Sequence, residues 1–184
     1  MSELKWCAIY LAGVGIVSFV LGRIVPKHWF RAEAFPFRCF DFEREGRIYE
    51  KLWIRKWQSK VLDMSRIVPF LMPKKRLIQG FEDKLPRMIQ ETCVAECVHE
   101  LLSIAGLMCL RIWSGPGGIV VTVLYIILGN VPYIIVQRYN RPRLVRMQKK
   151  LIERQKAKRI RISEWRREWL HENSDIKLQY RGRS

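Results

Sequence analysis

The sequence has too few cysteines, in an odd number, for a disulfide framework. The five are Cys7, Cys39, Cys93, Cys97 and Cys109, and most of them lie in apolar runs. A disulfide-stabilised domain carries an even number of cysteines at recurring spacings. We therefore expect free thiols that pack as small core side chains.

Charged residues are absent from long stretches of a chain that is strongly basic elsewhere. Residues 119–136 hold no charged side chain, and residues 6–25 hold only Arg23. About 20 apolar residues are what an α-helix needs to cross the hydrocarbon core of a bilayer. The excess of Lys and Arg, 34 against 17 Asp and Glu, collects in residues 27–90 and 138–184. Basic segments beside apolar spans are typical of cytoplasmic loops that face anionic lipid. Nucleic-acid binding would use the net charge of +17 but leaves the apolar spans unexplained.

The first apolar run lacks the features of a cleaved secretory signal. It is longer than the apolar region of such a signal, and the residues at its end, GRIVP at 22–26, are not a small-x-small cleavage site. We expect a retained membrane helix that Pro26 ends.

Two further spans are expected near residues 93–113 and 119–137. The turn-forming residues 114–118 between them allow only an antiparallel hairpin. The polar first half of the second span leaves open a shallow or re-entrant segment. The sequence thus predicts an all-α membrane protein with about three transmembrane helices, a single N-terminal helix and a hairpin.

Amphipathic interfacial helices are expected outside the spans. Residues 43–62 carry apolar side chains at helical spacing among many Lys and Arg, which is typical of a helix lying along the inner leaflet. Residues 84–86 resemble a helix start with proline in its first turn. We expect an integral membrane domain over 1–150 and a basic cytoplasmic tail over 151–184. This tail is expected to be partly helical, frayed in its middle, with its last dozen residues disordered.

Ionisable residues interrupt the second predicted span. Glu96 and His99 stand three residues apart and share a face of a helix. An ionisable group at bilayer depth costs roughly 2.5–3.5 kcal/mol on insertion scales, so such groups usually serve a function. A carboxylate beside an imidazole fixes its tautomer and strengthens it as a base. We predict His99 as a general base, Glu96 as its orienting partner and Glu91 as a second catalytic carboxylate. The alternative is that these groups only meet water at the membrane interface.

A basic, amide-bearing segment follows the third predicted span. In a hairpin, the start of one helix and the end of the other lie at the same depth, so this segment converges with Glu96 and His99. Cationic side chains there suit the phosphate of an acyl donor or a developing oxyanion. The pattern predicts acyl transfer from a CoA or phosphopantetheine donor to a hydroxyl of a lipid headgroup, without a further cofactor. The residues are Arg138, Asn140, Arg141 and Arg143.

Three sequence blocks, in this order, resemble the glycosyl-4,4'-diaponeurosporenoate acyltransferases (the CrtO family) of Gram-positive bacteria. They are FDFE…LWIRKWQSKVLD at 40–63, ETCVAECVHE at 91–100 and NVPYIIVQRYNRPRL at 130–144, within a resemblance that covers roughly residues 26–144. It implies a small acyltransferase of the bacterial cell membrane that esterifies a glucosyl hydroxyl of a glycosylated C30 carotenoid acid with a fatty acid. That reaction is the last step of staphyloxanthin-type carotenoid biosynthesis. The donor would be acyl-CoA or an acyl carrier protein, and the acceptor a lipid-linked sugar.

The resemblance adds Arg55, Lys56 and Gln137 to the expected substrate-binding residues. The basic tail beyond about residue 150 is longer than is usual in the family. The family pattern carries over to Arg55, Lys56, Trp57, Lys60, Asp63, Glu91, Glu96, His99, Asn130, Gln137, Arg138, Tyr139, Asn140, Arg141 and Arg143.

Two other functions fit parts of the pattern. Di-iron bundles use a Glu-x-x-His unit, but they need two such units with further carboxylates, and this chain has one. Cys93, Cys97 and His99 do not match a common zinc spacing, so no metal is expected. A non-enzymatic membrane adaptor would use the basic segments to hold anionic lipid or a partner. In that case, replacing His99 would affect only stability.

Overall fold

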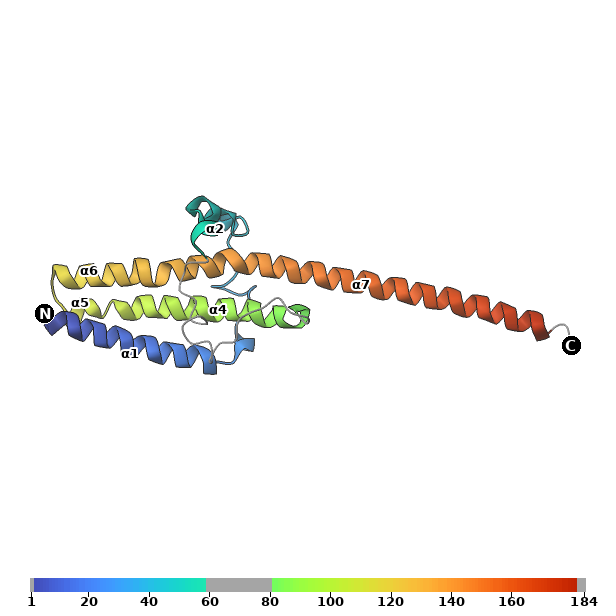
Figure 1. Cartoon of the computed structure of the whole chain (residues 1–184), viewed down its shortest axis with the longest axis horizontal. Coiled ribbons are helices and arrows are strands. Elements are labelled where there is room, and N and C mark those ends of the chain that lie inside the picture. The colour runs from blue at the N-terminus through green and yellow to red at the C-terminus, as the bar shows by residue number, and fades with distance from the viewer. Residues whose placement is uncertain (1, 59–80, 182–184) are drawn as a thin grey trace. The chain divides into compact units, whose positions relative to one another are not determined.

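The computed structural model describes residues 2–58 and 81–181, and all regular structure in these ranges is helical. Three helical runs are long and apolar enough to cross a membrane, Ser2–Ile24, Lys84–Ile112 and Pro116–Leu170. This confirms the expected all-α membrane fold with an N-terminal helix and a hairpin (Figure 1). The elements are α1 (Ser2–Ile24), η1 (Lys27–Trp29), η2 (Asp41–Glu43), η3 (Arg47–Leu52), α2 (Ile54–Trp57), α4 (Phe81–Gly106), α5 (Cys109–Ile112), α6 (Pro116–Leu124), η4 (Tyr125–Asn130) and α7 (Val131–Arg181).

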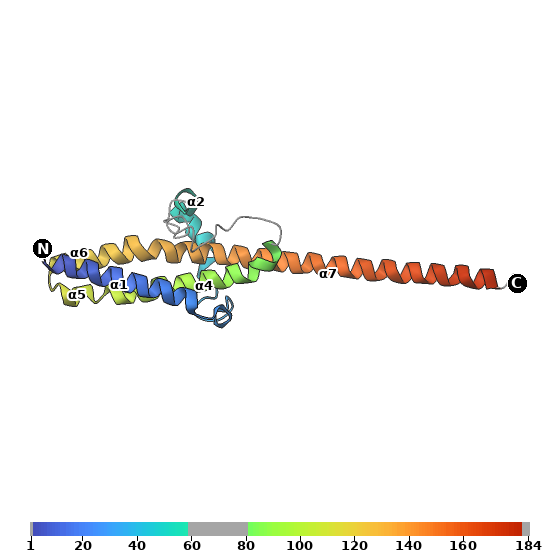
Figure 2. The same cartoon turned by 60° about the horizontal axis from the view of Figure 1, so that its bottom comes forward.

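The chain forms two compact units, Met1–Val145 and Arg146–Ser184. In the first unit, α1 packs on α4 and α5, while α6 and η4 pack back against α5 and α4. Both views show α1, α4 and α6 running side by side (Figures 1 and 2).

The outer surface of this bundle is apolar. Large side chains such as Ile16, Ile104 and Leu128 are each more than 60% exposed. A soluble protein rarely exposes so much contiguous apolar surface, whereas a lipid environment accommodates it. The outward faces of the spans are therefore lipid-facing.

Small residues line the contacts between the helices. A methyl group at Gly22 would lie 3.2 Å from Cγ2 of Val98, and one at Gly106 would lie 2.7 Å from the Tyr125 ring. Cys7, at one end of the bundle, is buried and donates its thiol to the Cys109 carbonyl. Within a membrane, helices associate through such close packing because lipid offers no hydrophobic drive between them.

The structure contains the expected hairpin, but its helices do not begin and end at the expected residues. The chain reverses at Trp113–Gly115, and α6 begins with Pro116 in its first turn. The second helical run begins at Phe81, three residues before the start expected at Lys84, so Pro86 lies inside α4. A short break at residues 107–108 separates α4 from α5.

The single amphipathic helix expected over residues 43–62 is wrong. The described part, 43–58, consists of short helical turns, and residues 59–62 lie outside the described residues. Arg44, Glu45 and Trp53 have positive φ angles, which interrupt an α-helix. Gly46, with φ +85°, lets this segment approach α7, since an added Cβ would lie 3.1 Å from the Tyr139 carbonyl oxygen.

The helical run after the hairpin turn contains a π-helical segment, η4. The Val131 N–H bonds to the Ile126 carbonyl, five residues back instead of four. From there α7 is α-helical to Arg181, so the fraying expected in its middle is wrong, and so is the disorder expected from residue 173 as far as Arg181; residues 182–184 lie outside the described residues.

We predict that Gly106→Ala destabilises the protein by about 1–3 kcal/mol, the usual cost of overpacking. The new methyl group would collide with the Tyr125 ring, at the π-helical segment. Thermal unfolding of the purified protein in nanodiscs measures the effect. Gly13→Ala is the matched control, because nothing lies within 4 Å of a Cβ there. Equal melting temperatures for the two variants would contradict the close α4–η4 contact.

Candidate active site

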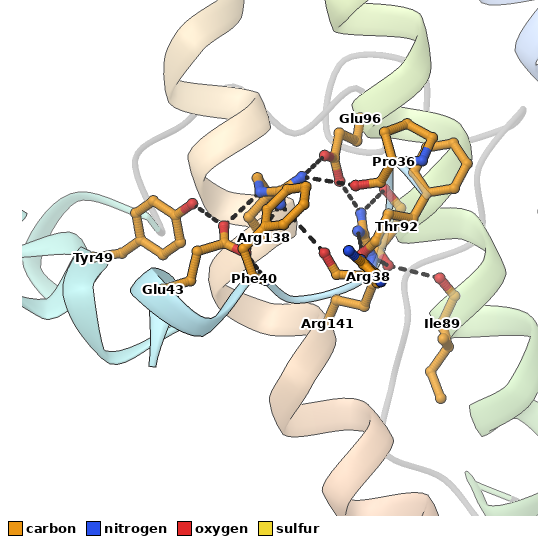
Figure 3. A network of polar contacts seen from close by, with 11 residues as sticks. Pro36, Arg38, Phe40, Glu43, Tyr49, Ile89, Thr92, Glu96, Arg138 and Arg141 are labelled. Atoms are coloured by element: carbon orange, nitrogen blue, oxygen red, sulfur yellow. Dashed lines mark hydrogen bonds and ion pairs between the residues drawn. The ribbon is translucent and has the colours of Figure 1, made fainter. Parts of the chain in front are cut away.

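Glu96 is the charge around which the polar side chains of the bundle gather. It lies on α4 and is fully buried. One carboxylate oxygen accepts a hydrogen bond from Arg138, and the other accepts one from Arg141. These two arginines are three residues apart on α7 and share a face, so a single carboxylate meets both (Figure 3).

Arg138 joins Glu96 to a second buried carboxylate, Glu43. Its Nε lies 2.6 Å from Oε1 of Glu43, and its Nη2 lies 3.0 Å from Oε2, a bidentate pairing. Two backbone carbonyls, of Pro36 and Arg38, each accept a further bond at 3.4 Å. The five N–H donors of the guanidinium therefore have as many acceptors within the protein.

Arg141 is 3% exposed, and each of its three guanidinium nitrogens donates a hydrogen bond. Besides Glu96, it donates to the Thr92 hydroxyl at 3.0 Å, the Thr92 carbonyl at 3.1 Å and the Phe37 carbonyl at 2.6 Å. Arg138 and Arg141 were predicted to bind substrate, but here their donors hold residues 36–43, α4 and α7 together. The reason is that a buried guanidinium requires a counter-charge and acceptors, and the protein supplies both.

Glu43 completes a cluster of two carboxylates and two guanidiniums. Burial alone would raise the pKa of the Glu43 carboxyl, but donors from Arg138, Tyr49 and the Phe40 N–H outweigh it and leave the pKa below its ordinary value. Burial and this carboxylate together raise the pKa of Tyr49 well above its usual range, so its hydroxyl stays protonated and donates to Glu43. The charges of the cluster thus balance.

A small pocket of about 40 Å³ opens beside the cluster, large enough for water but too small for a sugar. The pocket is lined by Ala32, Phe37, Cys39, Glu43, Arg138, Arg141, Pro142 and Val145.

His99 lies one turn beyond Glu96 and pairs with Asn130 of η4. Its Nδ1 is 3.0 Å from Oδ1 of Asn130, and the Asn130 amide nitrogen donates to the Tyr125 carbonyl at 3.0 Å. A carbonyl only accepts, so the amide oxygen must face His99. Nδ1 therefore carries the proton of the neutral imidazole, and Nε2 carries the lone pair. Tyr133 stacks on the ring at 4.4 Å between centroids, which fixes the plane of the imidazole.

The lone-pair nitrogen of His99 is not fully enclosed by the protein. Nε2 has no hydrogen-bond partner among the residues that the structure describes. Within the same residues, no fully buried side-chain nitrogen or oxygen lacks a partner. It follows that Nε2 is not sealed in the protein, and His99 as a whole is only partly buried.

The expected orientation of His99 by Glu96 is wrong, since both oxygens of Glu96 bind arginines and Asn130 holds the imidazole. Glu91 also lies apart. It bonds to Lys27 at 2.8 Å and pairs with Arg87, and its eight-residue separation from His99 amounts to about 12 Å along a helix. This geometry does not support the predicted role of Glu91 as a second catalytic carboxylate.

A second polar cluster, around Glu50, lies at the surface. Arg55 and Arg143 reach Oε1 of Glu50 at 2.9 and 2.7 Å, and Arg55 also donates to the Tyr139 hydroxyl at 3.2 Å. The Lys56 ammonium lies over the Trp53 ring, 3.9 Å from its centroid. Two further expected substrate-binding residues, Gln137 and Asn140, are partly exposed on α7, and Lys60 and Asp63 lie outside the described residues.

Sequence reasoning missed Glu43 and Thr92 as partners of the arginines, and Asn130 and Tyr133 as partners of His99. A polar partner for Asn130 could have been predicted from the sequence, because an amide in a charge-free span needs a hydrogen-bond partner inside the protein. Among the described residues, no group of three His, Cys, Asp or Glu side chains is placed to hold a metal ion.

Comparison with known proteins identifies relatives of the chain. Residues 26–150 match a family model described as CrtO, glycosyl-4,4'-diaponeurosporenoate acyltransferase. Proteins with this name from Staphylococcus aureus strains USA300 and NCTC 8325 / PS 47 are each 33% identical over 144 residues, which are 77% of this chain and 86% of theirs. The protein of strain MRSA252 matches to the same extent. No solved structure matches the chain.

We predict that Glu96→Gln destabilises the protein by about 3–5 kcal/mol, because it leaves two buried guanidiniums without their shared charge. Glu50→Gln is the matched control, since it breaks ion pairs at the surface, where the expected cost is below about 1 kcal/mol. Thermal unfolding in nanodiscs compares the two. Similar losses for both variants would mean that the buried cluster does not hold the segments together.

Proposed function

The chain belongs to the glycosyl-4,4'-diaponeurosporenoate acyltransferase family, and we propose that it transfers a fatty acyl group to a sugar hydroxyl of a glycosylated C30 carotenoid acid or a similar glycolipid. The observation that carries the proposal is His99, whose ring is fixed by Asn130 and Tyr133 while its Nε2 has no hydrogen-bond partner among the described residues. An acyltransferase requires a base of this kind to make a hydroxyl nucleophilic.

In the proposed reaction, Nε2 of His99 accepts the proton of the sugar hydroxyl as the oxygen attacks the thioester carbonyl of the donor. The carbon–sulfur bond then breaks, and the imidazolium returns the proton to the departing thiolate. Asn130 supports the imidazolium because its amide oxygen accepts from Nδ1–H throughout the cycle. Asn130 is thus a positioning residue that orients the imidazole, the role predicted from the sequence for Glu96.

The acyl donor would be acyl-CoA or an acyl carrier protein, both of which carry phosphate. Arg55, Lys56 and Arg143 form the cationic surface that fits such a donor, with Gln137 and Asn140 as amide donors nearby on α7. Glu50 holds the two guanidinium groups beside one another. In this assignment Arg138 and Arg141 do not bind the donor phosphate, because their N–H groups already donate to acceptors within the protein.

We place the protein in the bacterial cell membrane with its C-terminus in the cytoplasm. The support is the excess of Lys and Arg in residues 27–90 and 138–184, since such segments stay on the cytoplasmic side. An integral membrane domain over 1–150 would then carry the acyl transfer, and residues 151–184 would form a basic cytoplasmic tail that faces anionic lipid.

We predict that His99→Ala lowers acyl transfer by about 10²–10⁴-fold, the typical contribution of a general base, while the protein still inserts into the membrane. The assay is mass spectrometry of acylated glycolipid formed by the purified enzyme from acyl-CoA or acyl carrier protein. His28→Ala is the matched control, because His28 is exposed and contacts Trp29 edge-on. Full activity in His99→Ala would remove the base assignment.

The positioning role of Asn130 is tested by a pair of variants in the same assay. Asn130→Ala should reduce kcat, because both neutral tautomers of His99 then become populated and the reactive one is diluted. Asn130→Asp should keep more of the activity, since a carboxylate also accepts from Nδ1–H, and it should shift the pH profile. Equal losses in the two variants, with unchanged pH profiles, would indicate a structural role only.

The proposed orientation predicts that Lys150→Cys in intact cells resists a membrane-impermeant maleimide and reacts after permeabilisation. Ser2→Cys lies at the end of the first span that faces away from residues 27–90, so it should react in intact cells. The reverse pattern would place the C-terminus outside the cell.

A further inference from the structure

The part of α7 in the second compact unit, residues 146–170, has a composition unlike the rest of the helix. It holds ten Lys and Arg against three Glu, a net charge of +7 by subtraction. Most of it lies beyond residue 150, where the match to the family model ends. The proposed acyl transfer gives this segment no task.

Five of its eight large apolar side chains lie on one side of the helix, whereas Ile152, Ile160 and Leu170 lie elsewhere around it. At 100° per residue, the five fall within a sector of about 60°. Trp165 is 63% exposed, Trp169 50%, Ile162 45% and Met147 42%, while Leu151 is partly buried. A water-soluble helix gains nothing from exposing tryptophans on one face, so this face is suited to an apolar surface outside the helix.

Basic residues border and interrupt that face. Arg154 and Lys158 lie on the same side, between Leu151 and Ile162, and Arg161 and Arg166 lie on its two flanks. Long Lys and Arg side chains can lay their stems along an apolar layer while their charges stay in water. The combination of tryptophan, isoleucine and bordering cations fits an interface of lipid headgroups and acyl chains.

We propose that residues 147–169 bind an anionic lipid surface as an interfacial amphipathic helix, with Trp165 and Trp169 inserted at headgroup depth. Charge complementarity identifies the occupant, because a net charge of +7 attracts an anionic leaflet and repels a second copy of the same helix. A coiled-coil seam is also disfavoured, since Arg154 and Lys158 would stand in it. The proposal rests on the proposed placement of this tail against anionic lipid and makes it specific, but it does not depend on the acyl-transfer reaction.

The test is limited trypsin digestion of the full-length protein in nanodiscs, because the segment supplies its own cleavage sites. Nanodiscs of phosphatidylcholine alone are compared with nanodiscs that also contain phosphatidylglycerol. Proteolysis follows the population of locally open helix, so we expect cleavage at Lys156–Arg167 to slow by about tenfold in the anionic nanodiscs. Equal cleavage rates in the two lipids would overturn the proposal, as would protection that high salt does not weaken.

Two variants with the same change in charge separate an inserted face from simple attraction. Trp165→Glu lies within the apolar sector, and Ile160→Glu replaces another exposed apolar residue on the opposite side of the helix. We expect Trp165→Glu to lose the protection and Ile160→Glu to keep most of it. Equal behaviour of the two, whether protection is kept or lost, would overturn the inserted face. Acyl-transfer activity measured on the same samples reports separately on the proposed reaction.

Discussion

The shared ion pair of Glu96 with Arg138 and Arg141 is the contact on which the rest of the first unit depends. Breaking one partner of a buried ion pair is strongly destabilising, because the remaining charge has no solvent to return to. The two guanidiniums also donate hydrogen bonds to the carbonyls of Pro36, Phe37 and Arg38. Segments far apart in sequence thereby become one polar core, and the bundle around it can leave its outer surface to lipid.

The membrane spans and the hairpin were predictable because their signals are local. A run without charge and a cluster of turn-forming residues act within a few residues of where they stand. Residues 43–58 show the limit of such reasoning. Their apolar spacing is helical, but Glu43 is drawn to Arg138, 95 residues away in sequence, and the chain turns through Arg44 to Gly46 to reach it. Tertiary contacts of this range leave no mark on local periodicity.

The candidate site was half predictable for the same reason. His99 stood out as an ionisable residue in an apolar span, but the choice of Glu96 as its partner followed from nearness in sequence. Glu96 finds stronger partners in two guanidiniums, while the hairpin brings Asn130 to the imidazole. An amide thus holds the His99 ring in place of the expected carboxylate, without adding a second buried charge beside the imidazole.

The π-helical segment at Tyr125–Asn130 sets the direction of both groups relative to α6. Each extra residue in a helical turn rotates everything that follows by about 100° relative to an unbroken α-helix. Asn130, Arg138 and Arg141 all lie at or beyond the end of this segment, where Asn130 contacts His99 and the two arginines contact Glu96. Loss of one residue from the segment would restore ideal helix geometry and turn all three side chains away from α4. An irregular turn of helix thus lets α6 pack on α5 while the helix beyond it directs an amide and two guanidiniums toward α4.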